Sequence, residues 1–200
     1  MAQELLVYIS AATDLAAERE VLGRALAEIP CDVAFRVVQS PDGNGIVDEQ
    51  AIATADVHVL VLGGDIRAPV GLEWQLAHRA SRRPEPLLRQ DTLRTLAGQN
   101  FVRLVAKVQP WQPFRGVAEL RATVLDKVAG RILARPSRYG LTAAEIELLH
   151  AWRKGLRIDT SEVDASTRGG AGDSSRLLSR RQIATEGGIL LDRSSGDPSL

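Results

Sequence analysis

The chain has 200 residues, of which 44% are hydrophobic and 25% are charged. This length and composition are typical of one globular domain of ordinary size with an appendage, and they exclude a chain that is disordered throughout. The 25 basic residues balance the 25 acidic ones, so no net charge draws the chain toward nucleic acid or an anionic membrane. We therefore expect neither as a partner.

Three further features narrow the class of protein. The single cysteine, Cys31, begins a predicted strand, so we expect a small core residue and neither a disulfide nor a zinc cluster. Because the N-terminus runs straight into a strand without a basic stretch, it does not resemble a signal peptide. No apolar run approaches the roughly 20 residues that span a bilayer. We expect a soluble, cytoplasmic protein.

Strands and helices alternate through the first half of the chain. Leu5–Ser10 is a short apolar run that predicts a buried strand, and a helix capped by Thr13 or Asp14 follows it as far as Pro30. The remaining predicted elements of this half are a strand, a short helix and a central strand, at Val33–Val38, Val47–Thr54 and Val57–Leu62.

The second half continues the alternation after a helix that contains Glu73. Leu87-Leu88 predicts a short edge strand, a helix covers about residues 91–97, and alternating apolar residues predict a strand over Phe101–Val108. The segment 116–134 carries one apolar face and predicts a long helix. The chain is therefore predicted to be an α/β domain, with a parallel sheet of four or five strands flanked by helices.

The composition changes after Arg135. We assign residues 1–135 to the α/β domain, 136–158 to a helical extension and 159–200 to a flexible linker and docking tail. Thr142 and Glu145 form a capping box that begins the helix of the extension. A short apolar patch at 188–191 docks either on a partner or back on the domain, and the sequence does not choose between these.

The stretch Val57–Ala80 gathers the residues best suited to chemistry. A polar loop follows the central strand, and Gly71 then opens a helix with Glu73 near its start. In an open parallel sheet, ligands collect at this carboxyl end of the strands. Glu73 therefore either performs chemistry or only stabilises the helix dipole from the first turn.

Three stretches of the chain resemble one known family. They are Val7-Tyr-Ile-Ser-Ala-Ala-Thr-Asp-Leu-Ala-Ala-Glu-Arg19, Ala55–Arg67 and Gly71-Leu-Glu-Trp-Gln-Leu-Ala77. They are similar to the TIR-like family of bacterial domains, which opens with a strand followed by Ser-Ser-Thr, Asp-Leu and Glu-Arg. Trp111-Gln-Pro-Phe114 resembles the last strand-to-helix junction of that family. The resemblance covers about residues 5–134. It implies a flavodoxin-like sheet, related to TIR domains and nucleoside deoxyribosyltransferases, in a bacterial defence or signalling effector that acts with protein partners or by self-assembly.

The resemblance also implies a site. Glu73 is the carboxylate that stabilises the oxocarbenium-like centre formed when the bond between nicotinamide and ribose breaks. The residues implied to contact an NAD-type nucleotide are Ser10, Thr13, Asp65, Arg67 and Trp74. Arg67 is placed to meet a phosphate and Trp74 to stack on a base. The structural alternatives are a turn residue for Asp65, a solvated charge for Arg67, and a core or interface residue for Trp74.

The three histidines do not complete a catalytic or metal site. His58 lies inside the central strand, and we expect a buried histidine with its hydrogen bonds satisfied. His78, five residues after Glu73, points about 140° away on the helix. No histidine and carboxylate have metal-ligand spacing, so we predict no metal and no resident cofactor, with an NAD-type nucleotide as substrate or ligand.

Two functions of different class remain open. The first is a hydrolase of the NAD glycohydrolase type, which binds the nucleotide and cleaves its N-glycosidic bond. The second is a non-enzymatic adaptor that uses the same fold and its tail to recruit partners. The placement of Gly71 and Glu73 favours the enzyme. The turn Ser10-Ala-Ala-Thr13, which has one hydroxyl fewer than the family pattern, and the appended tail favour the adaptor.

Overall fold

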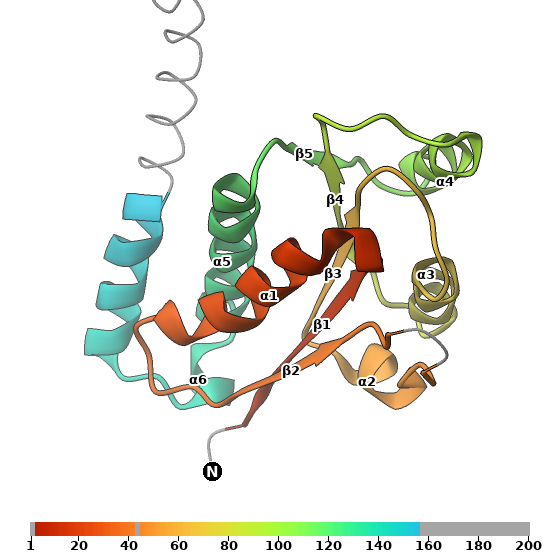
Figure 1. Cartoon of the computed structure of the whole chain (residues 1–200). Coiled ribbons are helices and arrows are strands. Elements are labelled where there is room, and N and C mark those ends of the chain that lie inside the picture. The colour runs from red at the N-terminus through yellow and green to blue at the C-terminus, as the bar shows by residue number, and fades with distance from the viewer. Residues whose placement is uncertain (1–2, 43–44, 157–200) are drawn as a thin grey trace, which may run out of the picture. The chain divides into compact units, whose positions relative to one another are not determined.

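A computed structural model describes residues 3–42 and 45–156, and the statements below concern this part of the chain. Its centre is a sheet of five parallel strands in the flavodoxin-like order β2-β1-β3-β4-β5 (Figure 1). The strands are β1 (Leu5–Ala11), β2 (Phe35–Gln39), β3 (Val57–Leu62), β4 (Glu85–Arg89) and β5 (Gln112–Phe114). The helices are η1 (Thr13–Leu15), α1 (Ala16–Ala25), η2 (Leu26–Glu28), α2 (Glu49–Thr54), α3 (Val70–Arg79), α4 (Leu96–Ala106), α5 (Val117–Leu133) and α6 (Pro136–Tyr139). The predicted α/β fold is confirmed, whereas the predicted linker and docking tail lie outside the described residues.

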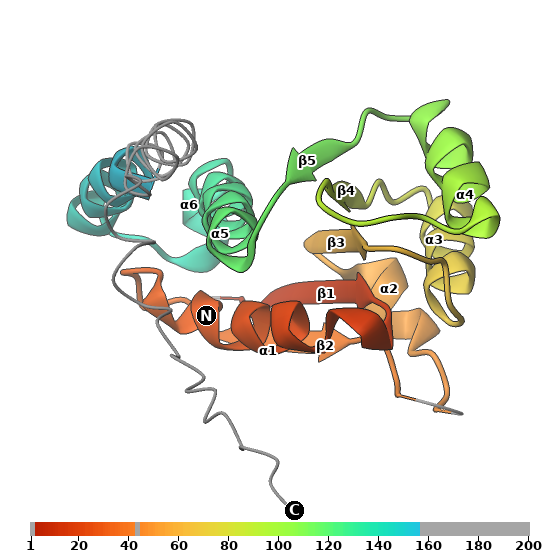
Figure 2. The same cartoon turned by 45° about the horizontal axis from the view of Figure 1, so that its top comes forward.

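Helices cover both faces of the sheet. α1 and α5 lie on one face, and α2, α3 and α4 lie on the other (Figure 2). The alternation of β1 explains this division, because Leu5, Val7 and Ile9 pack with α1 and α5 while Tyr8 packs with α2 and α3. β1 and β3 are buried along their whole lengths, as expected for inner strands with helices on both faces.

The predicted strand over Phe101–Val108 is wrong, because residues 101–106 belong to the helix α4 and residues 107–108 form the turn after it. Its apolar residues fit a period of two and a period of four. The helical period buries Phe101 and Val105, one turn apart, and leaves Leu104 45% exposed. The Thr95 hydroxyl caps the helix by accepting a hydrogen bond from Gly98 N at 3.1 Å. Helix α4 begins only at Leu96 and continues to Ala106, so the predicted helix at 91–97 is wrong for residues 91–95.

The strand order also changes one prediction about the edge of the sheet. Leu87 and Leu88 do form a strand, but β4 pairs with both β3 and β5 and is therefore not an edge strand. The fifth strand is the three-residue β5, in the segment that includes Pro113. Its brevity and its proline suit an edge position, where an unpaired backbone group meets solvent.

The predicted cap of the first helix is also wrong. Thr13 and Asp14 lie in the 3₁₀ helix η1, and no side chain caps either η1 or α1. Leu15 is buried in the core at this junction, so apolar packing fixes the entry to α1 in place of a polar cap. The second strand begins at Phe35, two residues later than expected at Val33.

The C-terminal part of the described chain is a helix over residues 143–156. The predicted capping box is confirmed, because Thr142 Oγ1 accepts from Glu145 N at 3.2 Å and Glu145 Oε2 accepts from Thr142 N at 2.8 Å. Leu149 and Leu156 belong to the same core cluster as α1 and α5. The helix therefore completes the core on that face of the sheet. No helix in the described residues is long and apolar enough to cross a membrane.

Candidate active site at the carboxyl ends of the strands

Glu73 lies in the first turn of α3 and points into the protein, with no exposed surface. The Tyr8 hydroxyl donates a hydrogen bond to its Oε1 at 2.8 Å, and the Ser40 hydroxyl donates to its Oε2 at 2.7 Å. Among the described residues, no basic side chain forms an ion pair with this carboxylate. Two neutral hydroxyls are therefore the side-chain donors that hold a fully buried carboxylate.

The two donors come from neighbouring strands. Tyr8 lies in β1, and its pKa is raised above the usual value by burial and by the adjacent Glu73 carboxylate. Ser40 follows β2 directly, and its Oγ also accepts a hydrogen bond from Ala11 N at 3.1 Å. The carboxylate of Glu73 on α3 is thus tied to the middle of β1 through Tyr8 and to the end of β2 through Ser40.

Ser10 is also fully buried, two residues after Tyr8 on the same face of β1. Its Oγ lies 2.7 Å from Nε2 of His58 in β3. Burial lowers the pKa of His58 to about 4, so the ring is neutral at pH 7. The prediction of a buried histidine is confirmed, but the prediction of satisfied hydrogen bonds is wrong for Nδ1, which is buried without a partner.

The other predicted site residues are dispersed. The Asp65 carboxylate accepts a hydrogen bond from the Thr95 hydroxyl, which ties the loop after β3 to the start of α4. Thr13 and Arg67 are exposed. Trp74 is only 8% exposed.

The surroundings of Trp74 are aromatic. The centroid of its ring lies 5.8 Å from that of Phe101, with the two rings nearly perpendicular, and 5.3 Å from that of His78, on which it stacks. The sequence left three roles open for Trp74, which are stacking on a base, core packing and an interface. The structure shows Trp74 as a residue of the core. His78 is exposed, away from the buried carboxylate of Glu73, as its helical spacing predicted.

A cavity of about 590 Å³ lies beside this site, within the range of small-molecule pockets. One wall comes from the loop between β2 and α2, and the other from the loop between β3 and α3. The lining residues are Gly45, Ile46, Val47, Glu49, Ile66, Arg67, Ala68, Pro69, Gly71 and Leu72. Arg67 is the predicted site residue on this wall, and Glu73 is the next residue after Leu72, with its side chain turned toward the sheet.

Two ion pairs at this end of the sheet escaped the sequence analysis. Glu18 is almost fully buried and pairs with Arg89, at the end of β4, at 2.7 Å. Arg19 donates to the Ser40 carbonyl oxygen at 2.6 Å and pairs with Asp42 at 2.5 Å. Glu18 and Arg19, the Glu-Arg step of the family resemblance, therefore hold the ends of β4 and β2 from helix α1.

No family model, curated protein or solved structure matches the chain. Within the described residues, no group of three or more histidine, cysteine or acidic side chains is arranged to hold a metal ion.

Proposed function

We propose that the chain is a TIR-like cytoplasmic effector of bacterial defence or signalling. In this proposal, an NAD-type nucleotide binds at the carboxyl ends of the strands, and Glu73 supports cleavage of its N-glycosidic bond. The observation that carries the proposal is the buried Glu73 carboxylate beside a cavity of about 590 Å³. A buried carboxylate without a cationic partner lowers stability, and such groups concentrate at functional sites.

The proposed cleavage needs one carboxylate near the ribose and a pocket that holds the nucleotide. The bond between C1′ of ribose and nicotinamide breaks, and nicotinamide leaves as a neutral base with the bonding electron pair. Glu73 stabilises the positive charge that develops on the ribose. Water then adds its oxygen to C1′, and one proton is released. In this proposal Arg67, which is exposed on the cavity wall, binds the phosphates of the nucleotide.

In the described conformation Glu73 is closed off, so the proposal requires an opening step. Ser40 bonds the carboxylate, and the loop that begins immediately after it forms one wall of the cavity. An outward movement of the loop between β2 and α2 would break this hydrogen bond and expose Glu73 to a bound nucleotide. We therefore assign activity to an assembled or partner-bound state that stabilises the open loop, with no resident cofactor.

The test is nicotinamide release from NAD by the purified full chain at high concentration, alone and with candidate partners. Glu73→Gln is the test variant, and Glu147→Gln is its matched control, since it makes the same change at an exposed position outside the cavity. Thermal unfolding of each variant verifies that it folds. Release by the wild type and the control, but not by Glu73→Gln, supports the proposal; release that persists in Glu73→Gln refutes it.

The alternative is a non-enzymatic adaptor, and one observation favours it. Ile46 is 94% exposed and Leu72 is 49% exposed, and both line the cavity at the carboxyl rim. Apolar side chains presented at the mouth of a cavity suit contact with another protein. In this alternative the rim binds a protein partner or a second copy of the chain, and Glu73 only fixes the packing of α3.

Two variants separate the functions. Ile46→Ser with Leu72→Ser removes the apolar rim, and deletion of residues 160–200 removes the predicted docking tail. Loss of partner recruitment in either variant, together with normal recruitment by Glu73→Gln and no nicotinamide release by any protein, establishes the adaptor. Release that depends on Glu73 refutes the adaptor as the whole function.

A further inference from the structure

A small cavity lies at the amino end of the sheet, beside Asp56, the residue that directly precedes β3. Its volume is about 180 Å³. The residues that line it come from the end of α2, the loop before β4, the end of α5 and helix α6. We call it the arginine cavity, and its lining residues are Thr54, Asp56, Arg82, Arg131, Arg135 and Arg138.

The carboxylate of this cavity is already fully engaged. Asp56 Oδ2 accepts a hydrogen bond from Leu6 N at 3.0 Å, and its Oδ1 pairs with Arg138 at 2.8 Å. Arg138 is held from a second side, because its Nε donates to Gln3 Oε1 at 2.7 Å. Of the described residues that line the cavity, Asp56 alone carries a carboxylate, and it neutralises one arginine of four.

The other arginines bring positive charge that is not balanced locally. Arg131 lies in the last turn of α5, where a cation is favourable, and Arg135 lies two residues beyond that helix. Among the described residues, no carboxylate forms an ion pair with either of them. Arg82 is held at the end of α2, where its Nε donates to the Ala53 carbonyl oxygen at 2.7 Å. Guanidinium groups around one small cavity repel each other, although the whole chain is neutral.

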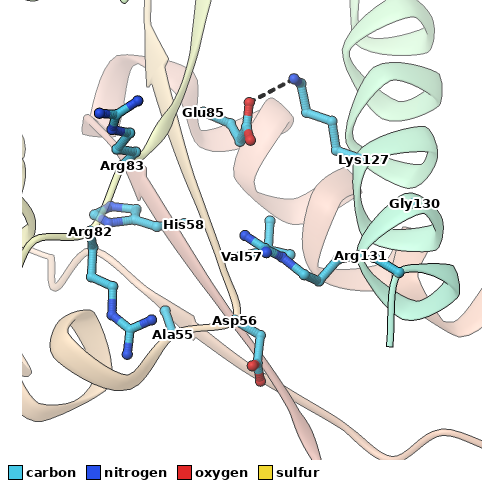
Figure 3. A pocket seen from close by; sticks show the side chains of 11 residues that line it. Ala55, Asp56, Val57, His58, Arg82, Arg83, Glu85, Lys127, Gly130 and Arg131 are labelled. Carbon is cyan, nitrogen blue, oxygen red and sulfur yellow. Dashed lines mark hydrogen bonds and ion pairs between the residues drawn. The ribbon is translucent and has the colours of Figure 1, made fainter. Parts of the chain in front are cut away.

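The buried hydroxyl of Tyr139 shows that three of the lining charges lie close together. Tyr139 is 2% exposed, in the core cluster on the α5 face of the sheet. Burial raises the pKa of its hydroxyl, the Asp56 carboxylate raises it further, and Arg138 and Arg131 lower it. Figure 3 shows Arg131 extending from α5 toward Val57, the residue that follows Asp56. Arg131, Arg138 and Asp56 therefore meet on one face of the sheet.

We propose that the arginine cavity binds one phosphoryl group, whose oxygens accept hydrogen bonds from Arg131 and Arg135. Because both arginines line a cavity of only about 180 Å³, an anion inside it lies within reach of both. Guanidinium groups bind phosphate with paired, charge-assisted hydrogen bonds, and a bound anion offsets their repulsion. The volume is below that of pockets for drug-sized molecules and suits a single anionic group. The site is independent of the proposed function, because it lies at the other end of the sheet from Glu73.

The test uses the two tyrosines of the full chain as reporters, with their rings labelled with ¹³C. The guanidinium of Arg138 lies over the Tyr139 ring, 5.3 Å from its centroid, whereas Tyr8 packs on the other face of the sheet. Inorganic phosphate is added at an ionic strength held constant with chloride. We expect a saturable shift of the Tyr139 signals and no comparable shift of the Tyr8 signals. Equal shifts of both, or no shift of Tyr139, would overturn the proposal.

Variants then separate a built site from general charge. Arg131→Gln with Arg135→Gln is expected to weaken phosphate binding by about tenfold or more, since each change removes charge-assisted hydrogen bonds. Arg79→Gln with Arg36→Gln is the matched control, because both are exposed outside the cavity and Arg79, like Arg131, lies in the last turn of a helix. We expect this control to leave binding unchanged. Thermal unfolding without phosphate verifies that each variant folds, and equal weakening by both pairs would refute the site.

A last experiment identifies the source of the phosphoryl group. Binding of inorganic phosphate is compared with binding of ribose 5-phosphate and of phosphatidylcholine vesicles that contain phosphatidic acid. Tighter binding of ribose 5-phosphate supports a soluble phosphate ester, and tighter binding of the vesicles supports a lipid headgroup. If inorganic phosphate binds most tightly, the ion itself is the ligand. In each case the binding must be lost in the Arg131 and Arg135 variant, and its retention there refutes the arginine cavity as the site.

Discussion

His58 makes a quantitative prediction for the pH dependence of stability. Its pKa in the folded protein is lowered to about 4 from 6.5 because burial disfavours the charged ring. Between these two values the unfolded chain binds a proton that the folded chain does not bind, so the free energy of unfolding falls as the pH falls. The stabilisation is complete above about pH 6.5 and is lost as the pH drops toward 4.

The size follows from the two pKa values. Each pKa unit corresponds to about 1.4 kcal/mol, so the difference between pH 7 and pH 4 is about 3 kcal/mol from this residue alone. This is a large part of the free energy of unfolding of an ordinary domain, about 5–15 kcal/mol. The chain is therefore expected to become markedly less stable at mildly acidic pH.

The assay is urea denaturation at several pH values between 7 and 4, for the wild type, His58→Gln and His78→Gln. Subtracting the His58→Gln curve from that of the wild type cancels the contribution of the carboxylates. We expect this difference to change by about 3 kcal/mol over the range, whereas the exposed His78→Gln should follow the wild type. Parallel curves for the wild type and His58→Gln would refute the assignment of a neutral, buried ring.

Three further predictions concern stability. Tyr8→Phe removes the donor to Glu73 Oε1 and should lower the free energy of unfolding by about 1.5–3 kcal/mol; a loss below about 0.5 kcal/mol in urea denaturation would contradict the buried hydrogen bond. Arg89→Gln leaves Glu18 buried and unpaired, so it should lower the free energy of unfolding by about 2 kcal/mol, a value between those for surface and buried ion pairs. The exposed pair of Arg24 and Glu20 is the control and should contribute less than about 0.5 kcal/mol in the same assay. Because α4 buries Phe101 and exposes Leu104, Phe101→Ala should lower the free energy of unfolding by about 3–5 kcal/mol and Leu104→Ala by less than about 1 kcal/mol. If thermal unfolding shows that Leu104→Ala is the less stable variant, the result favours the strand predicted from the sequence.

The sequence predicted most of the fold because its clearest signals are local. The apolar runs of β1 and β3 and the single apolar face of α5 belong to one element each, and each was assigned correctly. The segment around Phe101 failed because its apolar residues fit two periods, and only packing against Trp74 and Trp111 selects the helix. The three-residue β5 is too short to carry a periodic signal of its own.

The site was predicted less completely, because its contacts join distant parts of the chain. Glu73 was expected in a first helical turn and lies there, but its partners are 65 and 33 residues away in the sequence. A signal for Tyr8 did exist. Tyr8 and Ser10 are polar residues two positions apart in an apolar strand, so they share a face. Arg131 and Arg135, which line the arginine cavity at the amino end of the sheet, were hidden for a different reason, since a net charge of zero for the chain conceals a local excess of arginine.

Tyr8, Ser40 and Glu73 form a buried polar cluster, and replacing Tyr8 and Glu73 together tests whether the cluster serves packing or chemistry. A matched apolar pair in place of a buried polar one is often neutral or stabilising, whereas removal of one partner is costly. Tyr8→Phe combined with Glu73→Leu should therefore cost less than Tyr8→Phe alone, because no carboxylate is left without a donor. The Ser40 hydroxyl retains the Ile9 carbonyl oxygen, 3.5 Å away, as an acceptor. If this buried polar cluster only fixes the packing of α3, the double variant keeps every function of the protein. A stable double variant that loses nicotinamide release would instead show that Glu73 is maintained for chemistry at the expense of stability.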